Sequence, residues 1–248
     1  MSEFWYTLYT MQDLYGKDYE SFSLFGRVHL FWLVLSVFIW ILGAFLYHRA
    51  SEKRRRTWRA VLGTLLVLLE CSRQLTNVVT GQWEPAVMPL HLCSINIFVC
   101  AWYSIHPTKL AGNILYALCL PAAIIALLSP SWLALPITNF FHISSELLHI
   151  LLALYPVLLL AGGFRPDIHE LPKVLSCLLG VCVIIYPLNK VLDTNFMFLN
   201  DPYGNIITVA CTAVFGERFY LIGFAVILFL LMLILYLPWW ISGRKISS

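Results

Sequence analysis

Two histidines and a glutamate share one face of a strongly apolar segment. His142, Glu146 and His149 follow one another at intervals of four and three residues, and Asn139 stands three residues before the first of them. At about 100° per residue, the three ionisable side chains fall within an arc of roughly 60° on a helix, which Asn139 widens to about 80°. Ionisable groups are costly in hydrocarbon, so such a stripe on a membrane helix indicates either a polar partner or a task such as proton transfer or metal binding.

Cys93 is the candidate nucleophile. It lies near the start of another apolar segment, after Pro89 and His91, about 7 Å from the outer end of that segment and level with His142. A cysteine and a histidine at matching depth can form a thiolate with an adjacent base. In a regular helix His91 and Cys93 point about 160° apart, so both face one cavity only if Pro89 leaves the helix start irregular.

Polar side chains at a similar depth in other apolar segments extend this pattern. The sequence therefore predicts a polar cavity that opens toward the outer face of the membrane. The residues predicted to bind substrate there are Arg73, Asn77, His91, Asn96, Asn139 and Asn189. The alternative interpretation is that Arg73, Glu70 and Glu146 form an ion-pair network that only holds the bundle together.

The composition requires an integral membrane protein. Of the 248 residues, 60% are hydrophobic and 12% are charged, and a soluble chain of this length cannot bury so much apolar surface. Apolar windows of about 20 residues predict an all-α bundle of seven transmembrane helices. The predicted spans are 28–47, 59–79, 88–105, 110–128, 139–161, 173–192 and 220–241. Residues 206–216 are too short to cross and are predicted to be interfacial or re-entrant.

The distribution of basic residues predicts on which side of the membrane each terminus lies. The basic run from Arg49 to Arg59 follows the first span, and such runs remain on the cytoplasmic side. The prediction is an outside N-terminus and an inside C-terminus, with an extracytoplasmic segment 1–27, a membrane domain 28–242 and a cytoplasmic tail 243–248. The run is interpreted as a topology signal and not as a nucleic-acid site. The seven dispersed cysteines predict no disulfide framework.

Four motifs resemble the YwaF-like family of multi-pass membrane proteins, which includes the vertebrate transmembrane protein 164. They are Met88-Pro-Leu-His-Leu-Cys-Ser-Ile95, Asn113-Ile-Leu-Tyr-Ala-Leu-Cys-Leu-Pro121, the stretch from Asn139 to His149, and Thr194–Asn200 with Gly204-Asn205. The resemblance implies a seven-helix bundle and, from the vertebrate branch, a lipid acyltransferase that uses a membrane-embedded cysteine and a histidine. Carried onto this chain, it nominates Cys93 and His142, with His149 as the weaker choice. The length resembles the bacterial branch, which implies the plasma membrane.

Three functions are compatible with these residues. In the first, a lipid acyltransferase or acyl hydrolase without a cofactor, Cys93 attacks a membrane-lipid ester, His142 takes its proton, and Glu146 affects the basicity of the imidazole. In the second, His142, Glu146 and His149 bind zinc together with His91 or Cys93. In the third, the polar stripe is the path of a transporter or the site of a lipid-binding bundle. The outer segment 193–205 is either a lid or an interfacial loop.

Overall fold

The computed structural model describes residues 3–5, 7, 22–202 and 206–244, and this part of the chain contains helices and no strand. Every segment predicted to span the membrane is helical over most of its length. The predicted segment 1–27 and tail 243–248 lie largely outside the described residues. The helices are α1 (Arg27–Arg49), α2 (Glu52–Val79), α3 (Leu92–Ile105), α4 (Lys109–Ile114), α5 (Leu120–Leu128), α6 (Phe140–Ala161), α7 (Leu171–Leu192), α8 (Ile206–Phe215) and α9 (Tyr220–Arg244).

Five of the described helical segments are long and apolar enough to cross a membrane: α1, residues 109–128, α6, residues 168–192 and α9. Large apolar side chains of α1 and α9 are exposed along their length, as expected for helices that face lipid. The helix α2 is long but carries a charged first third and further charges in its outer half, whereas α3 has only 14 residues. The count of seven crossings and their orientation therefore stay predictions.

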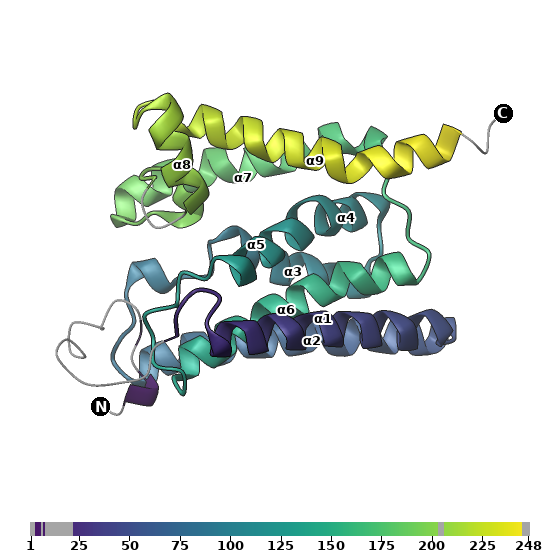
Figure 1. Cartoon of the computed structure of the whole chain (residues 1–248), viewed down its shortest axis with the longest axis horizontal. Coiled ribbons are helices and arrows are strands. Elements are labelled where there is room, and N and C mark those ends of the chain that lie inside the picture. The colour runs from purple at the N-terminus through teal and green to yellow at the C-terminus, as the bar shows by residue number, and fades with distance from the viewer. Residues whose placement is uncertain (1–2, 6, 8–21, 203–205, 245–248) are drawn as a thin grey trace.

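The helix α6 lies at the centre of the bundle, where it contacts α1, α2, α3 and α5 (Figure 1). Two glycines allow neighbouring helices around α6 to pack closely: Gly43 where α1 meets α6, and Gly63 where α2 meets α3. A Cβ atom at Gly43 of α1 would lie 2.8 Å from Leu154 Cδ1 of α6, and one at Gly63 of α2 would lie 2.8 Å from Ser104 Oγ of α3. Small residues at such crossings are the usual way in which membrane helices pack tightly, because lipid supplies no hydrophobic drive between them.

Residues 109–128 form one continuous helix that changes its winding in the middle. A π turn, Leu115–Cys119, links α4 to α5, and Pro121 stands in the first turn of α5. Proline lacks the N–H of an α-helical hydrogen bond, and its ring clashes with the carbonyl four residues earlier. The wider π turn immediately before Pro121 relieves this conflict without ending the helix. All five residues of the π turn are buried, so the distortion lies inside the bundle.

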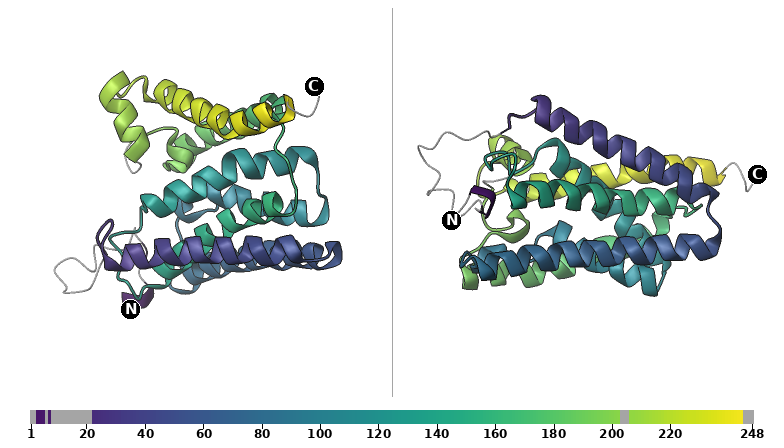
Figure 2. Two further views of the ribbon diagram at one scale, coloured as in Figure 1. Left: turned by 45° about the vertical axis from the view of Figure 1, so that its right-hand side comes forward. Right: turned by 90° about the horizontal axis from the view of Figure 1, so that it is seen from below.

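The last three helices form a second layer beside the first six (Figures 1 and 2). Hydrogen bonds join α9 to α4 and the π turn, because Tyr236 Oη donates to Asn113 Oδ1 (2.9 Å) and Trp239 Nε1 donates to Tyr116 Oη (2.9 Å). The Tyr116 hydroxyl in turn donates to the Leu235 carbonyl (2.6 Å). The segment predicted to be interfacial, 206–216, forms the short helix α8, which packs on α9.

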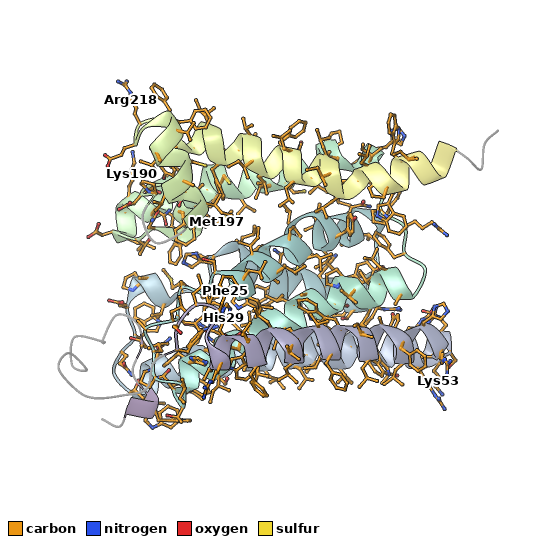
Figure 3. All side chains as sticks on the ribbon, viewed as in Figure 1. Phe25, His29, Lys53, Lys190, Met197 and Arg218 are labelled. Carbon is orange, nitrogen blue, oxygen red and sulfur yellow. The ribbon has the colours of Figure 1, made fainter. Side chains whose placement is uncertain are left out.

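The basic end of the bundle is tied by charged hydrogen bonds. Arg55 donates to the carbonyls of Tyr47 (3.1 Å), His48 (2.7 Å) and Gly162 (3.0 Å), and thus caps the C-terminal ends of both α1 and α6. Lys53 lies at this end, opposite Phe25 and Met197 (Figure 3). The Arg59 guanidinium donates to Glu52 and holds the pKa of that carboxyl below its usual value. Similarly, the Lys109 ammonium lowers the pKa of the Asp167 carboxyl.

Candidate active site

The motif that contains Cys93 begins outside its helix. His91 is the N-cap of α3, with an extended backbone (φ −69°, ψ 154°), and a short 3₁₀ turn, Pro85–Val87, precedes it. The helical angle of 160° between His91 and Cys93 therefore does not apply, as anticipated for an irregular start after Pro89. His91 Nδ1 accepts a hydrogen bond from the Met197 backbone N–H (3.3 Å).

A turn between α7 and α8 covers the His91 ring. Phe196 and Phe198 of the short 3₁₀ segment Phe196–Phe198 contact the imidazole, with ring centroids 5.4 and 5.6 Å away. Met197 and Phe198 have positive φ angles of 59° and 56°. Non-glycine residues rarely adopt this conformation, and the local packing must offset the strain. This part of the predicted outer segment is thus packed onto the start of α3, and the remainder, residues 203–205, lies outside the described residues.

Arg73 of α2 is the cation around which the candidate site is arranged. It lies close enough to Cys93, His91 and His149 for its charge to act on all three side chains. Cys93 belongs to α3, His91 is the N-cap of α3, and His149 belongs to α6. The predicted cavity required above all that the third and fifth spans be neighbours, and α2, α3 and α6 do contact one another. Arg73 is half-buried and makes no hydrogen bond or ion pair with any described residue.

Glu70 does not form a close ion pair with Arg73, which the alternative interpretation of an ion-pair network that holds the bundle together required. Its Oε1 accepts a hydrogen bond from Gln74 Nε2 (2.8 Å), and Gln74 also donates to the Val87 carbonyl. The other oxygen, Oε2, is buried and has no hydrogen-bond partner among the described residues. The four ion pairs between described residues instead join side chains near the ends of helices. An ion-pair network of Arg73, Glu70 and Glu146 is therefore not formed.

His149 offers one nitrogen as a base. Its Nδ1 lies 2.7 Å from the Ser145 carbonyl oxygen. Because a carbonyl only accepts, Nδ1 carries the hydrogen and Nε2 carries the lone pair. No described residue donates to this nitrogen. The ring is buried at 8% exposure and stacks on the indole of Trp132, with centroids 4.9 Å apart and an interplanar angle of 19°.

Glu146 is oriented by the same indole. Trp132 Nε1 donates to Glu146 Oε1 at 3.0 Å, whereas Glu146 Oε2 is buried and accepts no hydrogen bond from the part of the chain that the structure describes. Trp132 comes from the connection between α5 and α6 and is 5% exposed. The carboxylate therefore forms no hydrogen bond with either histidine of the stripe.

His142 lies in a different environment from His149. It is fully buried, and its ring contacts Phe22 (4.4 Å between centroids) and Trp32 (6.3 Å). Phe22 lies just before α1, and Trp32 lies within it. Neither of its ring nitrogens has a hydrogen-bond partner in the described part of the chain. No hydrogen bond therefore joins His142 to Cys93, and the rings that contact His142 come from α1 and from the segment before it.

The predicted substrate-binding asparagines have mainly local partners. Asn139 caps α6, where its Oδ1 accepts from the backbone N–H groups of Phe141 (2.8 Å) and His142 (3.2 Å). Asn96 Nδ2 donates to a carbonyl in its own helix. Asn189 holds the turn after α7 through four hydrogen bonds, to Thr194, Phe196 and Asn200. Asn77 is the exception, since its Oδ1 is buried and no described residue donates a hydrogen bond to it.

The residues considered for zinc do not converge. Among the described residues, no group of three or more histidine, cysteine, aspartate or glutamate side chains is placed to hold a metal ion. His142 and His149 are two helical turns apart, about 10 Å along the axis, and pack against different rings. His91 contacts a third segment. As placed here, these side chains do not fit a single zinc centre.

A family model supplies the remaining evidence. The model of the TMEM164 family matches residues 24–236, which include every helix from α1 to most of α9. This chain belongs to the TMEM164 family. The match confirms the resemblance deduced from the four motifs and, with the apolar helices, an integral multi-pass membrane protein. No curated protein and no solved structure matches the chain.

Sequence reasoning missed two residues near the site of this TMEM164-family protein. Trp132 lies in a connection without periodicity, so only its indole N–H, which needs a partner when buried, could have indicated a role. His29 of α1 is fully buried, accepts from the Phe25 N–H (2.8 Å) and donates to the Leu127 carbonyl (2.7 Å). Both nitrogens of His29 are thus satisfied, and its role is to join α1 to the end of α5.

Proposed function

We propose that this protein transfers acyl groups between membrane phospholipids, or hydrolyses them, with Cys93 as the nucleophile and His149 as the base. The observation that carries this proposal is Arg73 of α2, whose guanidinium lies in a predicted membrane span and forms no hydrogen bond or ion pair with any described residue. An ionisable residue in such a position is costly, so it is retained where a ligand completes its interactions. The phosphate of a lipid headgroup matches a guanidinium in both charge and geometry.

The position of Arg73 fits a substrate that reacts at Cys93. Its charge reaches Cys93, so an anion bound to it holds the neighbouring ester close to the sulfur. Phospholipids carry the phosphate and the ester carbonyl on one glycerol, only a few bonds apart. The apolar acyl chains remain among the lipid-facing helices. Binding of the headgroup thus turns an encounter between lipid and thiol into a positioned reaction.

The chemistry requires one base and no cofactor. His149 Nε2 takes the proton of the Cys93 thiol, and the sulfur attacks the ester carbonyl carbon. When the tetrahedral adduct collapses, the glycerol oxygen leaves and receives the proton from His149, which leaves a thioester on Cys93 and a lysophospholipid. A second alcohol or water then gives its proton to His149 and attacks the thioester. The acyl product departs and the proton returns to the sulfur.

This assignment changes the histidine that the sequence favours. His149 shares the surroundings of Arg73 with Cys93, whereas His142 lies among Phe22 and Trp32. His149 also has its tautomer set by the Ser145 carbonyl, which leaves Nε2 available. For the bacterial branch we propose the plasma membrane as the location, with Cys93 in the outer half of the bilayer.

Transfer by purified protein tests the proposal. The full-length chain is placed in vesicles of phosphatidylethanolamine and phosphatidylglycerol with a deuterated lysophospholipid, and acylated products are quantified by mass spectrometry. Cys93→Ala should lose at least about 100-fold of the activity, because the nucleophile is removed. Cys182→Ala is the matched control, since Cys182 is also a partly buried free cysteine but lies in α7. A hydroxylamine-sensitive acyl mass on the Cys93 peptide would identify the intermediate.

Two outcomes would contradict the enzyme. Full turnover by Cys93→Ala would remove the thiol mechanism. Lipid binding that depends on Arg73, without turnover by the wild-type protein, would favour a lipid-binding bundle, which is the non-enzymatic alternative.

A further inference from the structure

Trp132 occupies a position that neither the motifs nor the proposed function assigns. It lies in the connection between α5 and α6, yet it is almost fully buried and touches two residues of the α6 stripe. Its indole N–H donates to Glu146 Oε1 (3.0 Å), and its ring face stacks on His149 (4.9 Å between centroids, 19° between planes). Each contact uses a different part of the indole, so one side chain links the carboxylate to the imidazole.

We infer that Trp132 is a positioning residue for the His149 base and that Glu146 acts on this base through the indole. The inference rests on the proposed function, in which His149 Nε2 takes the proton of a thiol. Stacking fixes the plane of the imidazole, and the hydrogen bond from Nδ1 to the Ser145 carbonyl fixes its rotation within that plane. Together they set the direction in which the Nε2 lone pair points.

The same stack favours the reaction electrostatically. When His149 takes a proton its ring becomes a cation, and the face of an indole attracts a cation more strongly than it attracts a neutral ring. The indole therefore stabilises the state that exists only while the proton is on the base. Such a contribution lowers the barrier without strengthening substrate binding, so it affects kcat more than KM.

Glu146 holds the indole in place. Without the carboxylate oxygen, the buried indole N–H would lack a partner and the ring would turn to find one. Glu146 forms no hydrogen bond with either histidine of the stripe, so we assign its effect on the base to the hydrogen bond with Trp132. Glutamine keeps an acceptor oxygen at this position, whereas leucine removes it. The pair Glu146→Gln and Glu146→Leu thus separates the hydrogen bond from the charge.

The reactivity of Cys93 toward iodoacetamide tests the arrangement without any lipid substrate. Alkylation consumes the thiolate and releases iodide, so its rate reports how readily a base removes the thiol proton. The full-length protein in nanodiscs is sampled over time, and the Cys93 and Cys119 peptides are quantified by mass spectrometry. Cys119 is the internal control, because its sulfur is buried in the core and donates to the Leu152 carbonyl.

Trp132→Leu should slow alkylation of Cys93 about tenfold, and Trp132→Phe, which keeps a ring to stack, should slow it only about threefold. Glu146→Leu should resemble Trp132→Leu, and Glu146→Gln should resemble the wild-type protein. In all four variants the rate at Cys119 should remain unchanged. In the acyl-transfer assay, Trp132→Leu should lower kcat while KM changes less than twofold.

The controls distinguish a failure of the proposed function from a failure of the positioning role of Trp132. His149→Gln should slow Cys93 alkylation more than Trp132→Leu; if it has no effect, His149 is not the base and the proposed function fails. If His149→Gln slows the reaction but Trp132→Leu does not, only the positioning role is wrong. If Trp132→Leu instead speeds alkylation of both Cys93 and Cys119, the indole merely holds the bundle closed.

Discussion

Replacement of Arg73 by methionine should stabilise the protein while it removes the site for an anionic headgroup. A charged side chain at the centre of a membrane helix costs about 2.5–3.5 kcal/mol, and the cost falls toward the interface. Arg73 is six residues, about 9 Å, from the end of α2 at Val79, and it is half-buried without a hydrogen bond or ion pair to any described residue. We therefore expect the free energy of unfolding to rise by about 1 kcal/mol in Arg73→Met, which corresponds to about 2–4 °C in Tm.

The matched control is the arginine that has partners. Arg55 donates three hydrogen bonds to backbone carbonyls at the ends of α1 and α6. Arg55→Met leaves these carbonyls unsatisfied at a partly exposed site, so a loss of about 2 kcal/mol is expected after allowance for solvent. The assay is thermal unfolding in detergent, followed by circular dichroism, with and without an anionic lysophospholipid.

The two variants should therefore move Tm in opposite directions. Added lysophospholipid should raise the Tm of the wild-type protein and of Arg55→Met, but not that of Arg73→Met, because a ligand stabilises only the state that binds it. The reasoning is refuted if Arg73→Met destabilises the protein as much as Arg55→Met, since Arg73 would then be a structural residue.

Four further substitutions test other parts of the structure. Gly63→Ala should destabilise the protein by about 1–3 kcal/mol, because the added Cβ would lie 2.8 Å from Ser104 Oγ of α3. Gly180→Ala should stabilise the protein by about 0.5–1 kcal/mol, because no atom lies within 4 Å of its added Cβ. Chemical denaturation measures both effects. His142→Phe should leave acyl transfer and alkylation of the nucleophile within about threefold of the wild-type rates, and a loss of about 100-fold would return the base to this residue. The hydrogen bond with Lys109 is the main reason why the pKa of the Asp167 carboxyl is lowered in the folded protein. The stabilisation that this ion pair provides is therefore fully present above the unfolded pKa of about 4. It is lost as the pH falls through the lower folded pKa. The Tm difference between wild type and Asp167→Asn should therefore shrink between about pH 5 and pH 3, and a constant difference would mean that the ion pair is not what the substitution removes.

The helices were predictable because their signal is local. An apolar run of about 20 residues has no alternative but to become a helix in lipid, where every backbone group must be satisfied internally. The neighbourhood of Arg73, Cys93 and His91 was predictable for a related reason. Polar groups in hydrocarbon gain most by meeting one another, and their depths follow from the rise of each helix.

The partners of each polar side chain were not predictable in the same way. His91 lies outside its helix because a 3₁₀ turn and an extended N-cap precede α3, which the apolar pattern does not encode. Asn139 and Asn189 were expected to face a substrate, but asparagine oxygens serve equally well as helix caps and turn acceptors. The depth of an asparagine is fixed by its position in the chain, whereas its hydrogen bonds depend on which segment folds back over it.

The stripe on α6 illustrates this limit most clearly. His142 and His149 differ by seven residues, so they point in nearly the same direction from the helix. Helices that cross at an angle do not remain in contact along their full length, and the neighbour of one face changes from turn to turn. The turn with His142 meets Phe22 and Trp32, and the turn with His149 meets Trp132 and the surroundings of Arg73. A shared helical face therefore indicates that a stripe has a task, but only the crossing helices determine which of its residues can act with Cys93.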